Sequence, residues 1–185
     1  MKTLVLLLLS ALTIPAADQI TYWIEECHPG MSCVAGDLDL ARWAFAAWQR
    51  ESGGGLVMTE TPLEAKARFK LHWVSGNQNL YGETRPYMMG GKRGANIYVL
   101  PATYATADSL LRDAIVYLTC VHETGHALGL EHTNEFADIM YTFANGGDIN
   151  AYFGRYRDLL KTRQDIAKHA GVSDADRIAL RALYK

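Results

Sequence analysis

The feature that most constrains this chain is the segment HETGHALGLEH, which runs from His122 to His132. His122 and His126 are four residues apart, so on an α-helix they share one face and both Nε2 atoms can reach a single ion. A catalytic zinc takes three protein ligands, and His132 can supply the third only if the chain turns sharply after the helix. Gly129 permits that turn, because glycine adopts positive φ at little cost. We therefore predict a helix and a turn that together bind one zinc ion.

Glu123 follows the first of these histidines directly. From that position a carboxylate reaches the water beside the metal without becoming a ligand, which is where a general base is needed. A helix can carry two surface histidines for no functional reason. Chance alone, however, would produce all five fixed positions on the order of once in ten million positions. The pattern favours zinc-dependent hydrolysis of a protein or peptide substrate, because zinc acidifies water and polarises a carbonyl.

The same residues resemble the metzincin signature H-E-x-x-H-x-x-G-x-x-H, and Asp138-Ile139-Met140-Tyr141 resembles the methionine turn of that clan. Within the clan, Thr133 after the third histidine is similar to the matrixins, the family of the matrix metalloproteinase catalytic domains. The eight positions from His132 to Met140 are similar to those enzymes as well. The resemblance implies that Met140 forms a hydrophobic floor under the three histidines.

The resemblance also bears on the substrate pocket and on the number of metal ions. In matrixins the residue four places before the first histidine lines the pocket for the first side chain after the scissile bond, and here that residue is Leu118. Plain packing in the helix core is an equally good interpretation of Leu118. The His and Asp cluster that binds a second zinc in vertebrate matrixins is not apparent between Ser75 and Gly94, so we predict a single zinc ion. Thr142 occupies the position of the tyrosine ligand of astacins, which we therefore do not expect.

Hydrophobic periodicity predicts both strands and helices along the chain. The predicted strands cover residues 19–25, 56–59, 67–74 and 95–100, with an irregular edge strand at 81–89, and the main helices cover 37–50, 109–130 and a segment that begins at Ser173. An amphipathic helix is also expected between Ile149 and Leu160. Together with the resemblance, this order predicts an α+β, zincin-like fold. It would have a twisted mixed five-stranded sheet, three main helices and an active-site cleft above a smaller part that follows Gly129.

The first 17 residues have the parts of a secretory signal peptide: Lys2, an apolar run over residues 4–9, and the small residues of Pro15-Ala16-Ala17. The run is too short for a membrane span, which needs about 20 residues. An N-terminal strand fits less well, because the run lacks polar alternation. We predict a signal peptide at 1–17, a matrixin-like metallopeptidase domain at 18–185, and a secreted or periplasmic protein.

Composition and cysteine content complete the expectations. A formal net charge of −2 gives no basic surface for nucleic acid or for an anionic membrane, and we expect a monomer with neither partner. Cys27 and Cys33 flank the turn-rich segment HPGMS, which favours a disulfide between them in an oxidising compartment. Cys120 would then be a buried free thiol. The sequence alone leaves all three pairings open.

We predict a secreted, matrixin-like zinc endopeptidase, and two other functions compete with this prediction. One is a zinc-binding interaction module without proteolysis, against which Glu123 argues, since a structural site needs no base. The other is a metallohydrolase that acts on a non-protein substrate or processes a single partner. We also hypothesise that the tyrosine-rich segment from Tyr141 to Tyr156 covers the side of the cleft that lies beyond the scissile bond and narrows access to it.

Overall fold

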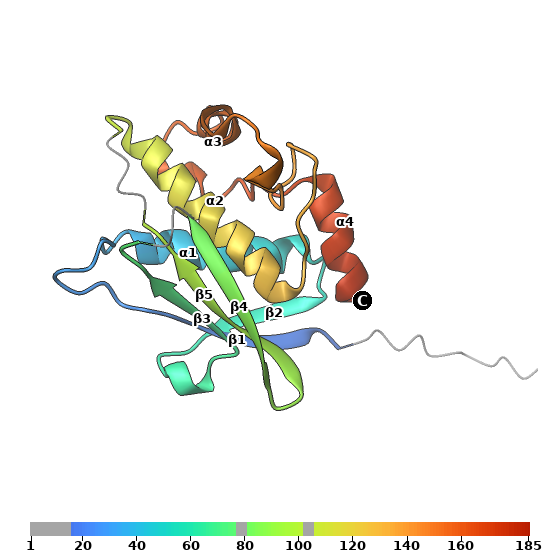
Figure 1. Ribbon diagram of the computed structural model, residues 1–185. Helices are drawn as coiled ribbons and strands as arrows, with labels where there is room; N and C mark the ends of the chain where they lie inside the picture. Colours follow the sequence, from blue (N-terminus) through green and yellow to red (C-terminus); the bar gives the residue numbers. More distant parts are fainter. Residues whose placement is uncertain (1–15, 77–80, 102–105) are drawn as a thin grey trace, which may run out of the picture.

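The computed structural model describes residues 16–76, 81–101 and 106–185. Most of the predicted signal peptide therefore lies outside the described residues. Within them, five strands form one mixed sheet, which confirms the prediction (Figure 1). The strands are β1 (Asp18–Ile24), β2 (Leu56–Glu60), β3 (Phe69–Trp73), β4 (Gly82–Met89) and β5 (Lys92–Val99). Their order is β2-β1-β3-β5-β4, in which only β4 runs antiparallel to its neighbour.

Alternation along the strands decides which face of the sheet is covered. In β3, Phe69, Leu71 and Trp73 are buried, whereas Lys70 and His72 are only partly buried. Successive side chains point to opposite faces, so one face is apolar and packs under helices (Figure 1). The edge strand β4 is regular, contrary to the expectation of an irregular strand. It pairs with β5 over its whole length through a hairpin turn.

The described residues contain four α-helices, α1 (Asp37–Glu51), α2 (Ser109–Leu128), α3 (Ile149–Arg157) and α4 (Asp174–Leu183). Three of them are the expected main helices, and α3 is the amphipathic helix expected after Ile149. The second main helix was predicted to reach residue 130 but ends at Leu128, because Gly129 adopts a left-handed conformation. Among the described residues we find no helix with the length and apolarity that crossing a bilayer requires.

Two contacts fix α2 against α1 and so position the end of α2 that carries the histidines. The indole Nε1 of Trp48 donates to the backbone oxygen of Val121 over 2.8 Å, and Trp48 is fully buried. At the other end, the guanidinium of Arg112 pairs with the buried carboxylate of Asp37, with Nη2 at 2.8 Å from Oδ2. A buried charge of this kind costs several kcal/mol if its partner is removed. Helix α2 is therefore tied to α1 near its N-terminus and again at the residue before His122.

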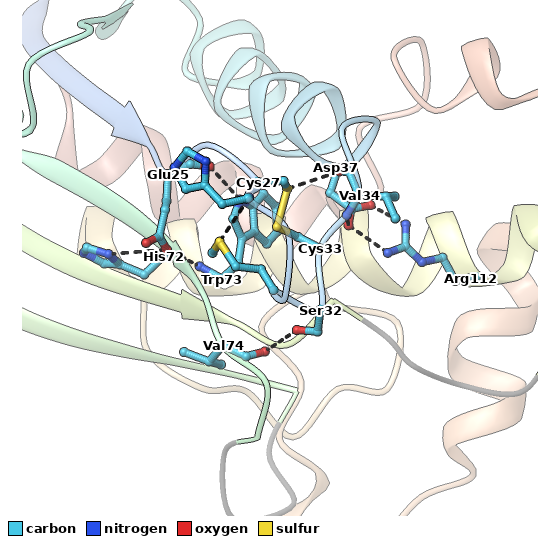
Figure 2. Close-up of a disulfide and its surroundings, with 12 residues drawn as sticks. Glu25, Cys27, Ser32, Cys33, Val34, Asp37, His72, Trp73, Val74 and Arg112 are labelled. Carbon is cyan, nitrogen blue, oxygen red and sulfur yellow. Dashed lines mark hydrogen bonds and ion pairs between the residues drawn. A yellow bond between two sulfur atoms is a disulfide. The ribbon is translucent and has the colours of Figure 1, made fainter.

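The loop between β1 and α1 contains a disulfide between Cys27 and Cys33, as predicted (Figure 2). Cys120 is a buried free cysteine. The loop is tied to its surroundings on two sides. Ser32 Oγ donates to the backbone oxygen of Val74 over 3.1 Å, next to the end of β3. The backbone N–H of Val34 donates to Asp37 at the start of α1 over 3.0 Å.

The chain after α2 has a different character. Within residues 129–185, β pairing is limited to an isolated bridge between Thr133 and Tyr141, and the rest is loop and short helix. We call the described residues up to Leu128 the sheet part and residues 129–185 the C-terminal part. The metal-binding segment crosses from one part to the other at Gly129.

Candidate metal centre

The last turns of α2 and the turn after it bring the three predicted histidines together. His122 and His126 are four residues apart on α2, and their ring centroids are 4.8 Å apart. Gly129 has φ of 103°, and the N–H of Leu130 donates to the oxygen of Gly125 over 3.0 Å, which closes the helix end. The turn carries Nε2 of His132 to 3.3 Å from Nε2 of His122 and 3.1 Å from that of His126.

The hydrogen bonds of two rings show that the cluster suits a metal ion. Nδ1 of His122 lies 2.6 Å from the oxygen of Ile139, and Nδ1 of His126 lies 2.9 Å from the oxygen of Leu130. A carbonyl oxygen only accepts, so each Nδ1 carries the proton and each Nε2 presents a lone pair. Lone pairs that converge on one point repel each other unless a cation lies between them. Three nitrogen donors that leave a fourth position open fit a catalytic zinc.

Electrostatics keep these rings in the neutral form that binds metal. Burial, with a smaller contribution from the neighbouring His126, lowers the pKa of His122 to about 3. Burial also lowers the pKa of His126 and that of His132. Neutral imidazole is the ligand form, so protons do not compete for the site near neutral pH.

Met140 packs against α2 at the turn that carries the histidines. It is 1% exposed, and a Cβ added to Gly125 would lie 2.5 Å from its sulfur. Met140 is therefore buried against α2 one residue before His126, and its role as a hydrophobic floor under the histidines stays a prediction. Gly125 is one of the variable positions of the histidine motif, so no signal in the motif indicated that only glycine fits there.

The methionine turn is held from α4. The buried carboxylate of Asp176 accepts from the backbone N–H of Ile139 over 2.8 Å and from that of Met140 over 3.4 Å. The hydroxyl of Tyr152 donates to the oxygen of Ile139 over 3.2 Å, the same oxygen that orients His122. Asp176 and Tyr152 therefore position the ring of His122 indirectly, and neither was a candidate from the sequence.

Glu123 follows His122 on α2 and is not part of the three-histidine cluster, and its role as a base stays a prediction. It is 6% exposed, and the hydroxyl of Thr84 lies 2.8 Å both from its Oε2 and from its backbone oxygen. Burial raises the pKa of Glu123 to about 7, and the hydrogen bond from Thr84 opposes this shift. A Cβ on Gly82 would lie 2.6 Å from Cγ of Glu123, so β4 approaches the base closely only because glycine stands there.

A cavity of about 420 Å³ opens beside the histidines. It is lined by residues of β4, β5, α2 and the turn after α2: Thr84, Pro86, Arg93, His126, Gly129, Leu130, Glu131 and His132. Arg93 donates to the oxygens of His126 and Ala127, both over 2.9 Å, and so satisfies carbonyl groups at the end of α2. The hairpin and the ligand helix are thereby fixed to each other.

Leu118 is 3% exposed and lines a second cavity of about 260 Å³, on the side of α2 that faces the C-terminal part. Tyr152, Tyr156 and Val172 also line this cavity. A Cβ on Gly171 would lie 2.7 Å from Leu118, so the loop before α4 covers this side chain closely. Leu118 is thus both a core residue and a cavity residue, and its contact with substrate stays a prediction.

The fold and the three-histidine centre define a zincin-like metallopeptidase. Among solved structures, that of archaemetzincin from Methanopyrus kandleri is similar, with a TM-score of 0.55 and 13% sequence identity over 92% of this chain and 98% of that chain. At this identity the likeness concerns the fold alone, and it confirms the predicted α+β, zincin-like class. The family model of the matrixins matches residues 15–153. The chain belongs to the matrixin family of zinc metallopeptidases, so its substrates are proteins or peptides.

Proposed function

We propose that this chain is an exported peptidase in which His122, His126 and His132 hold one zinc ion and Glu123 is the general base. The observation that carries the proposal is the placement of a buried carboxylate beside three converging imidazoles. Glu123 follows the candidate ligand His122 and is not itself one of the three candidate ligands. Its pKa is raised to about 7, which suits a group that takes and returns a proton.

Each residue of the site has a separate role in the proposed hydrolysis. When bound, zinc supplies Lewis-acid polarisation of the scissile carbonyl and lowers the pKa of the attacking water. Glu123 takes the proton of that water and passes it to the leaving amine. Thr84 and the buried surroundings fix the carboxylate in place. The backbone oxygens of Ile139 and Leu130 hold the rings of His122 and His126 in the ligating tautomer.

The free edge of β4 is the surface on which an extended substrate would pair. Leu100 donates to Tyr81 over 2.8 Å, and in an antiparallel pair the groups that face the partner alternate with groups that face away. The backbone groups of Gly82, Thr84 and Pro86 therefore face the free edge. Met88 faces the same edge, but Pro86 has no N–H and interrupts it, so near Glu123 the positions that can both donate and accept are Gly82 and Thr84.

Export and metal content rest on separate support. A signal peptide at residues 1–17 agrees with the disulfide between Cys27 and Cys33, because such bonds persist in oxidising compartments. One zinc ion agrees with the metal-capable side chains: among the described residues, the three histidines are the only group of three or more that could hold an ion.

Replacement of the base tests the proposal directly. Zinc-loaded protein should cleave members of a peptide library, as detected by mass spectrometry, and Glu123→Gln should lower kcat by about 10²–10⁴-fold with zinc content unchanged. Glu135→Gln removes an exposed carboxylate from the C-terminal part and is the matched control. If the wild type binds zinc but cleaves nothing, the chain is a zinc-binding module without proteolysis. Full activity in Glu123→Gln would exclude Glu123 as the base.

A further inference from the structure

The face of α2 that carries the metal ligands is open at one end only. Spacings of three and four residues place Thr119 and Ile115 on the same face as His122 and His126, one and two turns toward the N-terminus of α2. The two histidines are partly exposed. Thr119, in contrast, is 5% exposed and Ile115 is 7% exposed. The open surface therefore ends within about one helical turn of the ligands.

Helix α3 and the start of β4 close this end. Helix α3 packs against the N-terminal half of α2 (Figure 1). The ring of Phe153 on α3 lies 5.4 Å, centroid to centroid, from the ring of Tyr81, which directly precedes Gly82. Gly82 contacts Glu123, and Tyr81 is its neighbour in the chain. The contact between Tyr81 and Phe153 therefore joins the sheet part to α3 close to Glu123. At the other end of β4, the cavity lined by Pro86 and His132 stays open.

The closure is a fixed part of the structure, because α3 is anchored at several points. Arg157 at its end donates to the carboxylate of Asp108, the N-cap of α2, over 2.7 Å. Tyr156 donates to the backbone oxygen of His169 over 2.7 Å. The Tyr152 hydroxyl donates to the methionine turn, as described above. Three side chains of one short helix thus hold it to three different segments.

Extended substrates have a direction relative to this closed end. Antiparallel pairing is the more stable arrangement, so a peptide on the edge of β4 runs opposite to the strand. Its amino side then lies toward Pro86 and the open cavity, and its carboxyl side lies toward Tyr81. One helical turn rises about 5.4 Å and one extended residue spans about 3.3 Å, which leaves room for about one or two residues past the scissile bond.

We propose that the contact between Tyr81 and Phe153 limits substrates to peptides that are cleaved close to their carboxyl terminus. The inference rests on the proposed function and names its substrate class. Water adds across the peptide bond, and the products are a shortened peptide with a new carboxylate and a released amino acid or dipeptide.

Two peptide ladders built on one cleaved sequence test the proposal. One ladder lengthens the amino side to about six residues and the other lengthens the carboxyl side equally, each with a free and an amidated carboxyl terminus. We expect kcat/KM of the zinc-loaded protein to fall at least about tenfold once more than two residues follow the scissile bond. Lengthening the amino side should cause no such fall. Equal cleavage of long carboxyl-side peptides, or a penalty on the amino side instead, would overturn the proposal.

Variants on both sides of the contact test its cause. Phe153→Ala and Tyr81→Ala should each relieve the length limit, whereas Phe153→Leu, which keeps bulk, should retain most of it. Tyr98→Ala is the matched control, because Tyr98 stacks on His72 on the opposite face of the sheet. Thermal unfolding identifies any variant that fails to fold. A length limit that is unchanged in folded Phe153→Ala and Tyr81→Ala proteins would contradict this assignment.

A binding experiment separates this inference from the proposed function. Zinc-loaded Glu123→Ala protein, which should not hydrolyse peptides, is titrated with the same ladders labelled with a fluorophore, and Kd is measured by anisotropy. We expect Kd to rise at least about tenfold beyond two carboxyl-side residues. This result would support the closed end even if the wild type cleaved no peptide. Length-independent binding would refute it whether or not Glu123 is the base.

Discussion

The two parts of the molecule that meet at the metal centre satisfy their backbone polar groups in different ways. In the sheet part, hydrogen bonds of the sheet ladder and of long helices do most of this work. In the C-terminal part, side chains from distant segments do it. Asp176 accepts from Ile139, Tyr152 donates to Asp138, and Arg155 donates to Phe136. The C-terminal part therefore depends on individual side chains, whereas the sheet part depends on repeated backbone patterns.

The metal ligands come from both parts. His122 and His126 belong to α2 in the sheet part, and His132 belongs to the C-terminal part, with Met140 packed beneath. A bound ion thus links a rigid helix to a segment with little regular structure. The comparison leads to four predictions, from the largest expected effect to the smallest.

Removal of the metal should have the largest effect. Chelation, or His132→Ala, should abolish peptidase activity, because three ligands are needed for a catalytic zinc. It should also raise the hydrogen exchange of residues 130–141 more than that of α1, since the ion connects the C-terminal part to α2. Added zinc should restore both properties after chelation but not in His132→Ala. An equal rise of hydrogen exchange in residues 130–141 and in α1 would show that the two parts do not depend on the ion differently.

Loss of the α4 carboxylate should destabilise the protein most among single side chains of the C-terminal part. Asp176→Ala leaves buried N–H groups without an acceptor, each of which costs about 1–3 kcal/mol, and we expect a loss of about 2–4 kcal/mol in the free energy of unfolding. Denaturation in urea measures this change. Asp174→Ala, at an exposed position of the same helix, should cost well under half as much. Similar losses in the two variants would show that α4 merely packs on the turn.

Gly82→Ala tests the close approach of the sheet part to the base. The added methyl group would lie 2.6 Å from Cγ of Glu123, so the carboxylate must move. We expect kcat to fall on the order of 10²-fold with the zinc content unchanged, because a displacement of about 1 Å can cost that much. Gly76→Ala adds a methyl group in open space and should behave as the wild type. Unchanged kcat would mean that Glu123 has freedom that this packing does not indicate.

The hydroxyl of Thr84 should have the smallest effect. Thr84→Val keeps the shape of the side chain but removes the donor to Glu123, and we expect kcat to fall about tenfold with KM nearly constant, in line with a hydrogen bond to a charged group. Thr84→Ser should recover most of the loss, because it restores the hydroxyl. A kcat that recovers in Thr84→Ser but not in Thr84→Val is a result that a packing role would not produce. Equal impairment of both variants would assign Thr84 to packing.

The metal ligands could be predicted because every requirement is local. His122, His126 and His132 lie within eleven positions, and helix periodicity together with one glycine turn is enough to bring them together. Alternation in β3 was equally clear, and the turn-rich segment between Cys27 and Cys33 favoured the pairing that is found without excluding the others, because these patterns too act between near neighbours.

The surroundings of the base could not be predicted, because they depend on packing between distant segments. Thr84 and Glu123 are 39 positions apart, and Asp176 and Ile139 are 37 positions apart. Nothing in the local pattern of β4 marks Gly82 as the residue that makes room for a carboxylate, and nothing in α3 marks Phe153 as the partner of Tyr81. By itself the sequence indicated the cluster of three histidines and the family resemblance, and it led to Glu123 as the proposed base. The tertiary structure alone decided how the carboxylate of Glu123 is held and that Phe153 lies against Tyr81, since these contacts form only when α2, α3 and β4 pack together.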